Sequence, residues 1–453
     1  MHKSTLAIAV AVGLLAQQAS AAGFIEDSKA TLKLRNFYIN NDNRDSGTKA
    51  AGAQSKTEEW GQGFQLDFTS GFTQGTVGFG IDAIGLLGVK LDSSAGKHGN
   101  PTGANYGGSV FPSDGNHAVD DFSSLGLTAK AKVSQTELRI GTLQPKLPVI
   151  VSNDGRMLPQ TFQGGQITSS EFKDLTFTGG QIEHAKGRNS SNNEGLSIAG
   201  ANNSITGKFV NKFYYGGVDY KVNKDLLLQY YYGNLEDFYK QNFLGLVHNW
   251  SIGPGVLKSD LRYFNSTDDG KNGHDSAYYT TGDYANSSAG SGKGKVDNNL
   301  ISGLFLYTVE GHTFGGGYQV SNGSSDFPFL NQGDGASAYI PTDMQISKFA
   351  RAGERTWQAR YSYDFAKVGV PGLTAGAVYL RGDNIDTYNS KNVQTSNGSS
   401  EWERDITVAY VIQEGTLKNL GFMWKNAMWR NDIAGQRDQD ENRLIVSYSI
   451  PLL

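Results

Sequence analysis

The sequence predicts an all-β fold, a transmembrane antiparallel β-barrel of about eighteen strands with an inward-folded third external loop. Apolar and polar residues alternate along the chain, as in residues 443–450 (RLIVSYSI), and no long apolar helix interrupts this pattern after the first 21 residues. The chain is polar on average, with a mean hydropathy of -0.42, although 11% of its residues are aromatic. A barrel wall has this composition, because its outward residues face lipid and its inward residues face water.

The N-terminus has the three parts of a secretory signal peptide. Lys3 is basic, residues 6–15 are apolar, and Ala19-Ser20-Ala21 supplies small residues for cleavage. Residues 1–21 are therefore predicted to be removed and residues 22–453 to form one barrel domain. Without Lys3 the 40 basic residues become 39, against 44 acidic residues, which gives a net charge of -5. This mild acidity argues against a nucleic-acid partner, and the absence of cysteine excludes disulfides and thiol-based sites.

A hairpin is predicted near the start of the barrel. Positions 64, 66, 68 and 72 and then positions 77, 79 and 81 are apolar, and residues 73–76 form a tight turn between them. The alternation is clearest in residues 357–365 (WQARYSYDF), which are followed by the turn residues 370–372 (VPG). Each of these segments therefore has one face for lipid and one for the lumen.

Counting such segments from residues 31–39 to residues 443–450 gives about eighteen strands, an even number as single-chain bacterial barrels require. The pattern is least regular at residues 194–199 and 299–309. Short turns alternate with long stretches rich in Gly, Ser, Asn and Asp, such as residues 90–121. We expect the short turns at the periplasmic end and the long loops outside the cell.

A barrel of this size encloses an aqueous channel, so a selective pore needs an element that narrows it. Residues 144–172 are the candidate, because three prolines stiffen the segment and its apolar residues are unfavourable in water. Folding this loop inward would bury the apolar residues and place Arg156 in the lumen.

The inward positions of the predicted strands are rich in basic residues. A channel lined by cations attracts anionic solutes, and an arginine can bind both oxygens of a carboxylate. The alternative interpretation is that these charges pair with wall acids such as Asp260, Asp364 and Asp405. Outside the narrowest part of the pore, the predicted basic ladder comprises Lys33, Arg35, Lys130, Lys132, Arg139, Lys258, Arg262 and Arg360.

Several blocks of the chain occur in a specific order: residues 23–28 (GFIEDS), 34–38 (LRNFY), 70–91, 141–165, 235–239 (LEDFY), 353–371 and 443–446 (RLIV). With these blocks the chain resembles the outer-membrane porin D (OprD) family of substrate-selective bacterial channels. The resemblance implies an eighteen-stranded monomeric barrel with an inward-folded third loop. It also implies a ladder of basic residues that leads carboxylate-bearing solutes to the narrowest part of the pore, the eyelet.

By this resemblance, Arg156 corresponds to the loop arginine of the eyelet, Lys425 to one of two arginines on the penultimate strand, and Arg443 to the arginine of the last strand. The chain departs from the family pattern at Met423 and Val378, where relatives carry basic residues. Fewer fixed guanidinium groups favour the branch of the family associated with benzoate-like and other small organic acids. The sequence therefore predicts selective passive uptake of small carboxylate-containing solutes across the outer membrane of a Gram-negative bacterium.

A basic amino acid or peptide porin of the same family and a general diffusion porin are the alternatives. An outer-membrane hydrolase is the least favoured, because no motif marks a nucleophile beside a histidine. We expect no catalytic residues, no cofactor and no metal site, since the seven histidines lack ligand spacing. The expected partners are small organic anions and outer-membrane lipid, and the expected state is a monomer, with a weak trimer as the alternative.

Overall fold

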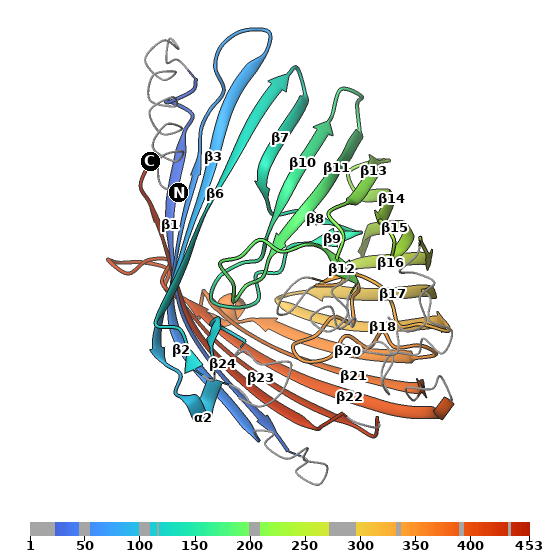
Figure 1. The fold of residues 1–453 in the computed structure, drawn as a ribbon. Helices are drawn as coiled ribbons and strands as arrows, with labels where there is room; N and C mark the ends of the chain where they lie inside the picture. Colours follow the sequence, from blue (N-terminus) through green and yellow to red (C-terminus); the bar gives the residue numbers. More distant parts are fainter. Residues whose placement is uncertain are drawn as a thin grey trace.

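The computed structural model of the protein describes residues 23–44, 55–98, 109–115, 117–198, 209–270, 296–331, 337–388, 394–433 and 436–453, so the predicted signal peptide lies outside the described residues. The chain forms a closed antiparallel sheet of 18 strands (Figure 1). The first strand, β1 (Lys29–Asn43), pairs with the last, β24 (Gln439–Pro451), and Thr31 lies opposite Pro451. The predicted barrel class and strand number are confirmed.

The other wall strands follow in chain order, and each pairs with its neighbours along the sequence. They are β2 (Lys56–Thr69), β3 (Gly78–Asp92), β6 (Asp121–Val133), β7 (Thr136–Leu143), β10 (Thr161–Ser169), β11 (Leu175–Lys186), β13 (Phe213–Lys221), β14 (Leu226–Leu235), β15 (Tyr239–Ile252), β16 (Gly255–Asp268), β17 (Asp297–Val309), β18 (His312–Gly323), β20 (Arg355–Asp364), β21 (Leu373–Tyr388), β22 (Gln394–Val411) and β23 (Gly421–Asn431). The connections carry α2 (Ala95–His98), the 3-10 helix η1 (Phe365–Val368), and the short strands β4 (Ser113–Asp114), β5 (His117–Ala118), β8 (Lys146–Leu147), β9 (Ile150–Val151), β12 (Ser197–Ile198) and β19 (Leu330–Asn331).

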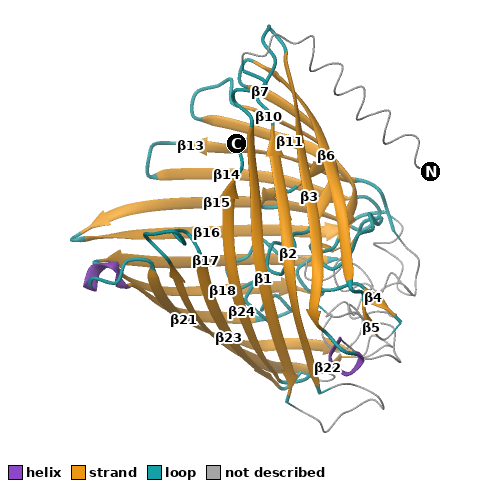
Figure 2. Cartoon of the chain, turned by 90° about the vertical axis from the view of Figure 1, so that its left-hand side faces the viewer, coloured by secondary structure: helices purple, strands orange, loops and turns teal. Residues whose placement is uncertain are grey.

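The two rims of the barrel differ in the length of their connections. The rim where β1 begins and β24 ends has short turns, such as Glu310-Gly311 between β17 and β18, where φ is +47° and +85° as a type I′ turn requires. The opposite rim carries long connections; Figure 2 shows α2, β4 and β5 gathered at the end of the long strands β1, β2 and β3. We assign the rim with long loops to the cell exterior.

The outer face of the wall is apolar, as the alternation predicts. On β23 and β24, for example, Phe422, Trp424 and Leu444 are each about two-fifths to one-half exposed, while Ala427 on the inward side is fully buried. Large apolar side chains at such exposure suit contact with lipid rather than water. Within the described residues, no helix has the length and apolarity to cross a membrane.

Two external loops fold into the lumen and form its packed core. The third loop, residues 144–160, and the seventh loop, residues 324–354, both contribute to one buried cluster, in which Val149 and Ile150 join Phe327 and Ile340. In Figure 1 the third loop, with β8 and β9, lies inside the ring of strands. The inward folding of the third loop is as predicted.

The tip of the third loop approaches the barrel wall closely. Met157 and Leu158 are each 2% exposed and pack in a second cluster with Phe37 and Phe111. Two glycines of β2 permit this approach, because a Cβ at Gly61 would lie 2.6 Å from the sulfur of Met157 and a Cβ at Gly63 would lie 2.8 Å from its carbonyl oxygen. The wall and the loop are therefore matched in shape.

Three sequence-based boundaries are wrong. The constriction loop ends at residue 160 rather than 172, because residues 161–169 form β10. The sequence of β10 is polar and rich in glycine, but the segment pairs with β7 and β11 as a wall strand. The described part of the predicted segment 194–199, residues 194–198, forms no wall strand: β12 pairs with β19 between two loops, whereas β17 is a regular wall strand. The turn between β2 and β3 spans residues 70–77 and is longer than expected.

Candidate functional site

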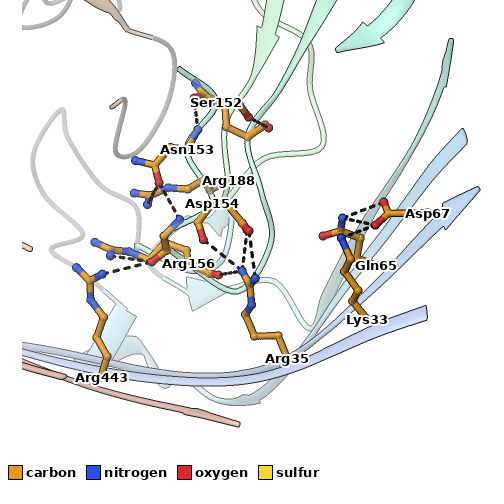
Figure 3. A network of polar contacts seen from close by, with 12 residues as sticks. Lys33, Arg35, Gln65, Asp67, Ser152, Asn153, Asp154, Arg156, Arg188 and Arg443 are labelled. Carbon is orange, nitrogen blue, oxygen red and sulfur yellow. Dashed lines mark hydrogen bonds and ion pairs between the residues drawn. The ribbon is translucent and has the colours of Figure 1, made fainter. Parts of the chain in front are cut away.

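The tip of the third loop is fixed to β1 by an arginine fork. Arg35 Nη1 donates to Asp154 Oδ1 at 2.7 Å and to the Arg156 carbonyl at 2.6 Å, while its Nη2 donates to Asp154 Oδ2 at 3.2 Å (Figure 3). From the fourth external loop, Arg188 Nη1 donates to Asn153 Oδ1 at 2.9 Å. The backbone that carries Arg156 is therefore held from two sides, and Arg35 acts as an anchor of the loop.

Arg443 joins both inward loops to the wall. Its Nε donates to Glu441 Oε1 at 2.5 Å, its Nη1 to the Gly155 carbonyl at 3.4 Å and its Nη2 to the Gln345 carbonyl at 3.0 Å. The residue is only 6% exposed. Because each of its three nitrogens donates to a protein oxygen, Arg443 contributes positive charge to the lumen and holds both loops in position.

The three predicted eyelet residues lie together at this point. Arg156 Nη2 is 3.9 Å from Glu441 Oε2, and Lys425 is the cross-strand neighbour of Arg443. All three cations interact electrostatically with one another and with Glu441, and Asp405 interacts with Lys425 and Arg443. We call Arg156, Lys425, Arg443, Glu441 and Asp405 the constriction cluster; it holds three cations and two carboxylates.

The two carboxylates of the cluster and Lys425 differ in the contacts that they make within the protein. Glu441 pairs with Arg443, and Asp405 accepts the Gln345 backbone N–H at 3.3 Å. Among the described residues, no carboxylate oxygen lies within 4.0 Å of the Lys425 ammonium group, and the side chain is partly exposed. Lys425 is thus the cation of the cluster with the fewest contacts to carboxylates of the described residues.

The seventh loop is held by carboxylates of β22, which sequence reasoning missed. Glu403 accepts the backbone N–H groups of Ile346 and Ser347 at 2.9 and 2.7 Å, and Glu401 accepts the Ser347 hydroxyl at 2.7 Å. Glu401 and Glu403 are almost fully buried beneath the loop. The signal was an acid at every second position of β22, which places Glu401, Glu403 and Asp405 on one face of the strand.

Two arginines of the predicted ladder also hold the seventh loop. Arg262 Nη1 donates to the Tyr339 carbonyl at 3.1 Å, and its guanidinium lies 4.1 Å from the centre of the Tyr339 ring. Arg360 donates to the Pro341 carbonyl. These contacts make both arginines anchors of the loop, in addition to any effect of their charge on solutes.

A buried carboxyl group closes the end of the seventh loop. Glu354 Oε2 accepts the Arg351 backbone N–H at 2.9 Å. Burial, reinforced by the charge of neighbouring Glu401, raises the pKa of Glu354 well above its usual range. Burial therefore favours the uncharged form of Glu354 in the folded protein.

Most of the predicted ladder is paired with acids. Along single strands the pairs are Glu137 with Arg139 and Asp260 with Arg262, and between strands they are Lys33 with Asp67 at 2.7 Å and Lys130 with Asp82 at 2.6 Å. The eyelet pair of Glu441 and Arg443 has the same spacing along its strand as the two arginine pairs. These sites therefore fit the alternative interpretation, in which wall acids pair with the basic residues. For the arginines, the sequence signal of this pairing was an acid two residues earlier in the chain. Asp364, in contrast, caps η1 by accepting the Ala366 N–H.

Two ladder lysines lack such pairing. Lys132 lies 5.6 Å from the centre of the Phe72 ring, and Lys258 is exposed at an inward position of β16. In the described part of the chain, neither ammonium group has a carboxylate partner within 4.0 Å. They remain charged groups near the periplasmic half of the wall.

A cavity lies beside the base of the third loop. It has a volume of about 400 Å³ and is lined by charged and polar side chains that include Asp67, Asp82, Arg139 and Gln166. Its size suits a small organic solute. The protein thus offers a polar compartment rather than an apolar wall beside the base of the third loop.

One histidine has a structural role. His98 Nδ1 lies 2.8 Å from Glu59 Oε1, and its Nε2 lies 2.7 Å from Ser113 Oγ. Glu59 also accepts the Val110 N–H at 2.9 Å, so these contacts anchor the second external loop to β2. In the described residues, no group of three potential ligands could hold a metal ion.

Comparison with known proteins agrees with this architecture. Residues 22–452 match the model of the family described as outer membrane porin, OprD family. The chain is 36% identical over 451 residues to the porin-like protein GalP of Pseudomonas putida, which covers 99% of this chain and 97% of the relative.

Two crystal structures of Pseudomonas aeruginosa proteins are also similar, each covering 95% of this chain and 100% of its own. OccK8 (OprE) has a TM-score of 0.83 at 62% identity, and OpdK has a TM-score of 0.80 at 34% identity. With the closed barrel and the two inward loops, these matches show that the chain belongs to the OprD family of outer-membrane porins, which are channels and not enzymes.

Proposed function

We propose that this outer-membrane channel mediates selective passive uptake of small carboxylate-containing solutes, including aromatic acids such as benzoate. The observation that carries the proposal is the composition of the constriction cluster, in which three cations meet two carboxylates that are themselves bound to Arg443 and to the Gln345 N–H. A net positive charge in a narrow, protein-walled passage raises the local concentration of anions. The compared OpdK structure contains vanillate, itself a carboxylate.

Within this proposal the three cations have different tasks. Arg443 holds the third and seventh loops and supplies a fixed charge, since its donors are used by protein oxygens. Lys425 and Arg156 are the groups that a carboxylate contacts during passage. A flexible ammonium group binds an anion without enclosing it, which permits the release that conduction requires.

The predicted ladder then extends the path beyond the cluster. Lys33 and Arg139 retain about half of their side-chain exposure despite their acid partners, and Arg139 lines the cavity beside the third loop. Alternating cations and carboxylates give a passing solute several weak sites rather than one deep one. We propose that one chain is the transporting unit, because its sheet closes on itself and both constricting loops are its own.

The test uses the purified wild-type protein in planar bilayers and in proteoliposomes. Benzoate, arginine and a neutral sugar of similar size are compared for reversal potential and for uptake as a function of concentration. We expect the anion benzoate to be favoured, with saturable uptake that weakens as ionic strength rises. Preference for arginine would instead support the basic amino acid alternative, and unsaturable uptake of all three solutes would support a general diffusion porin.

A further inference from the structure

The lipid-facing side of the barrel changes from apolar to polar at a defined level of the wall. On β22 the outward residues Tyr410, Val408 and Ile406 are followed, toward the external rim, by Arg404. The intervening residues are inward, as the burial of Glu403 beneath the seventh loop shows. Arg404 therefore marks the external edge of the apolar band on this strand.

The two following strands change at the same level. On β23 the outward residues Phe422 and Trp424 are followed by Asn426, and on β24 the outward residue Leu444 is followed by Asn442. Asn426 lies opposite Asn442, and its Nδ2 donates to Asn442 Oδ1 at 3.0 Å. The edge is thus a continuous row of one guanidinium and two amides across three strands.

Arg404 lacks an acidic partner in this row. Its Nη2 donates to Asn426 Oδ1, while its Nε is buried without a hydrogen-bond acceptor. No carboxylate oxygen of the described residues lies within 4.0 Å of its guanidinium nitrogens. A guanidinium that is desolvated at the edge of an apolar surface without a counter-charge is unfavourable unless an anion completes it.

The neighbouring outward arginines are neutralised within the chain. Arg381 Nη2 lies 2.9 Å from Asp383 Oδ1, and Arg430 and Arg44 approach Asp440 to 2.7 and 2.6 Å. Arg404 thus differs from arginines at similar positions on the adjoining strands. The difference points to a partner outside the protein.

Aromatic side chains beside Arg404 indicate the membrane interface. Tyr379 is its cross-strand neighbour and stacks on Trp402 with ring centres 5.8 Å apart, and Trp357 lies 5.3 Å from Tyr379. Tyr and Trp gather at the level of lipid headgroups. Arg404 therefore lies where headgroup phosphates are available.

We propose that Arg404, with Asn426 and Asn442, forms a binding site for a phosphate group of an outer-leaflet glycolipid. A guanidinium offers paired donors to phosphate oxygens, and the amide groups can turn their N–H donors toward the same anion. A second copy of the chain fits less well, because packing this face about a two-fold axis would bring Arg404 against Arg404. This inference is independent of the solute that the pore carries.

The experiment measures lipid binding by the full-length protein in detergent micelles after removal of divalent cations. Native mass spectrometry quantifies retention of lipid A with both phosphates, and of the same lipid after enzymatic dephosphorylation. The variants are Arg404→Gln and the matched control Arg381→Gln, whose arginine lies on the same belt but pairs with Asp383. Heat-dependent gel mobility verifies that each variant forms the barrel.

We expect wild type to bind the phosphorylated lipid about tenfold more tightly than the dephosphorylated one, equivalent to about 1.4 kcal/mol. Arg404→Gln should lose most of this preference and Arg381→Gln should keep it. Equal binding of the two lipids by wild type would overturn the proposal without reliance on any variant. It would also be overturned if both variants lost the preference equally, or if cross-linking showed that a second barrel covers Arg404.

Discussion

The two loops that narrow the lumen are held there by different forces. The third loop buries apolar side chains, with Met157 and Leu158 packed against Phe37 and Phe111. The seventh loop also buries Phe327 and Ile340, but its residues 339–347 are held by polar contacts to their backbone, from carboxylates of β22 and from arginines of other wall strands. Apolar burial can be predicted from apolar residues in the loop's own sequence. Polar anchoring depends mainly on charged residues in the wall strands that face the loop.

Arg443 is the contact that both loops share, so its removal should have the largest effect. Arg443→Ala leaves Glu441 buried without its close partner and releases the Gly155 and Gln345 carbonyls. Breaking a buried ion pair costs about 3–5 kcal/mol. We expect a lower unfolding temperature in detergent and a higher single-channel conductance. If conductance is unchanged, Arg443 does not hold the loops in the lumen.

Met157→Ala should displace only the third loop. The cavity left by truncating a buried methionine costs about 2–5 kcal/mol, and Met157 is 2% exposed. Because the chain contains no cysteine, Val151→Cys in the third loop and Ile346→Cys in the seventh give separate labelling sites. Maleimide should react faster at position 151 and at an unchanged rate at position 346. Equal acceleration at both positions would mean that the loops move as one unit.

Glu403→Gln should displace only the seventh loop, with a smaller effect. The substitution keeps one acceptor oxygen but replaces the other with an NH2 group, which cannot accept a hydrogen bond from the Ile346 or Ser347 N–H. A buried N–H donor that loses its acceptor costs about 1–3 kcal/mol. The same two cysteine reporters should now show faster labelling at position 346 alone. Acceleration at position 151 instead would contradict the polar anchoring of the seventh loop.

Glu354→Gln should have the smallest effect at neutral pH, although Glu354 is also buried in the seventh loop. Its raised pKa favours the uncharged form of the carboxyl group in the folded protein, and an amide resembles that form. In the unfolded chain the carboxyl ionises at its lower, ordinary pKa, so wild type should lose stability as pH rises above that value. Thermal unfolding between pH 4 and pH 8 should show this loss in wild type and less of it in the variant. A variant that is strongly destabilised at pH 5 would show that the carboxyl group acts as an anion.

The barrel was predictable from the sequence because lipid and water impose a period of two on every wall strand. The inward third loop was predictable because its apolar residues needed burial. The end of the third loop was not predictable from the sequence, since the glycine-rich β10 shows little alternation. It forms a strand through its pairing with β7 and β11.

The site was predictable only in part. The sequence placed Arg156, Lys425 and Arg443 together through a family resemblance, and the structure brings them together around Glu441. It did not foresee that the donors of Arg443 are used by two loops, because Gly155 and Gln345 are distant in the chain and meet only in the folded lumen. Contacts to backbone carbonyls leave no trace in residue type.

The central claim is that the excess positive charge of the constriction cluster selects carboxylates. The most direct measurement is the reversal potential in a sodium benzoate gradient for wild type and Lys425→Glu. The control is Lys224→Glu, since Lys224 has a side chain that is 90% exposed in the turn between β13 and β14. We expect benzoate to permeate better than sodium in wild type and in the control, and Lys425→Glu to reverse that preference. An unchanged benzoate preference in Lys425→Glu would contradict the claim.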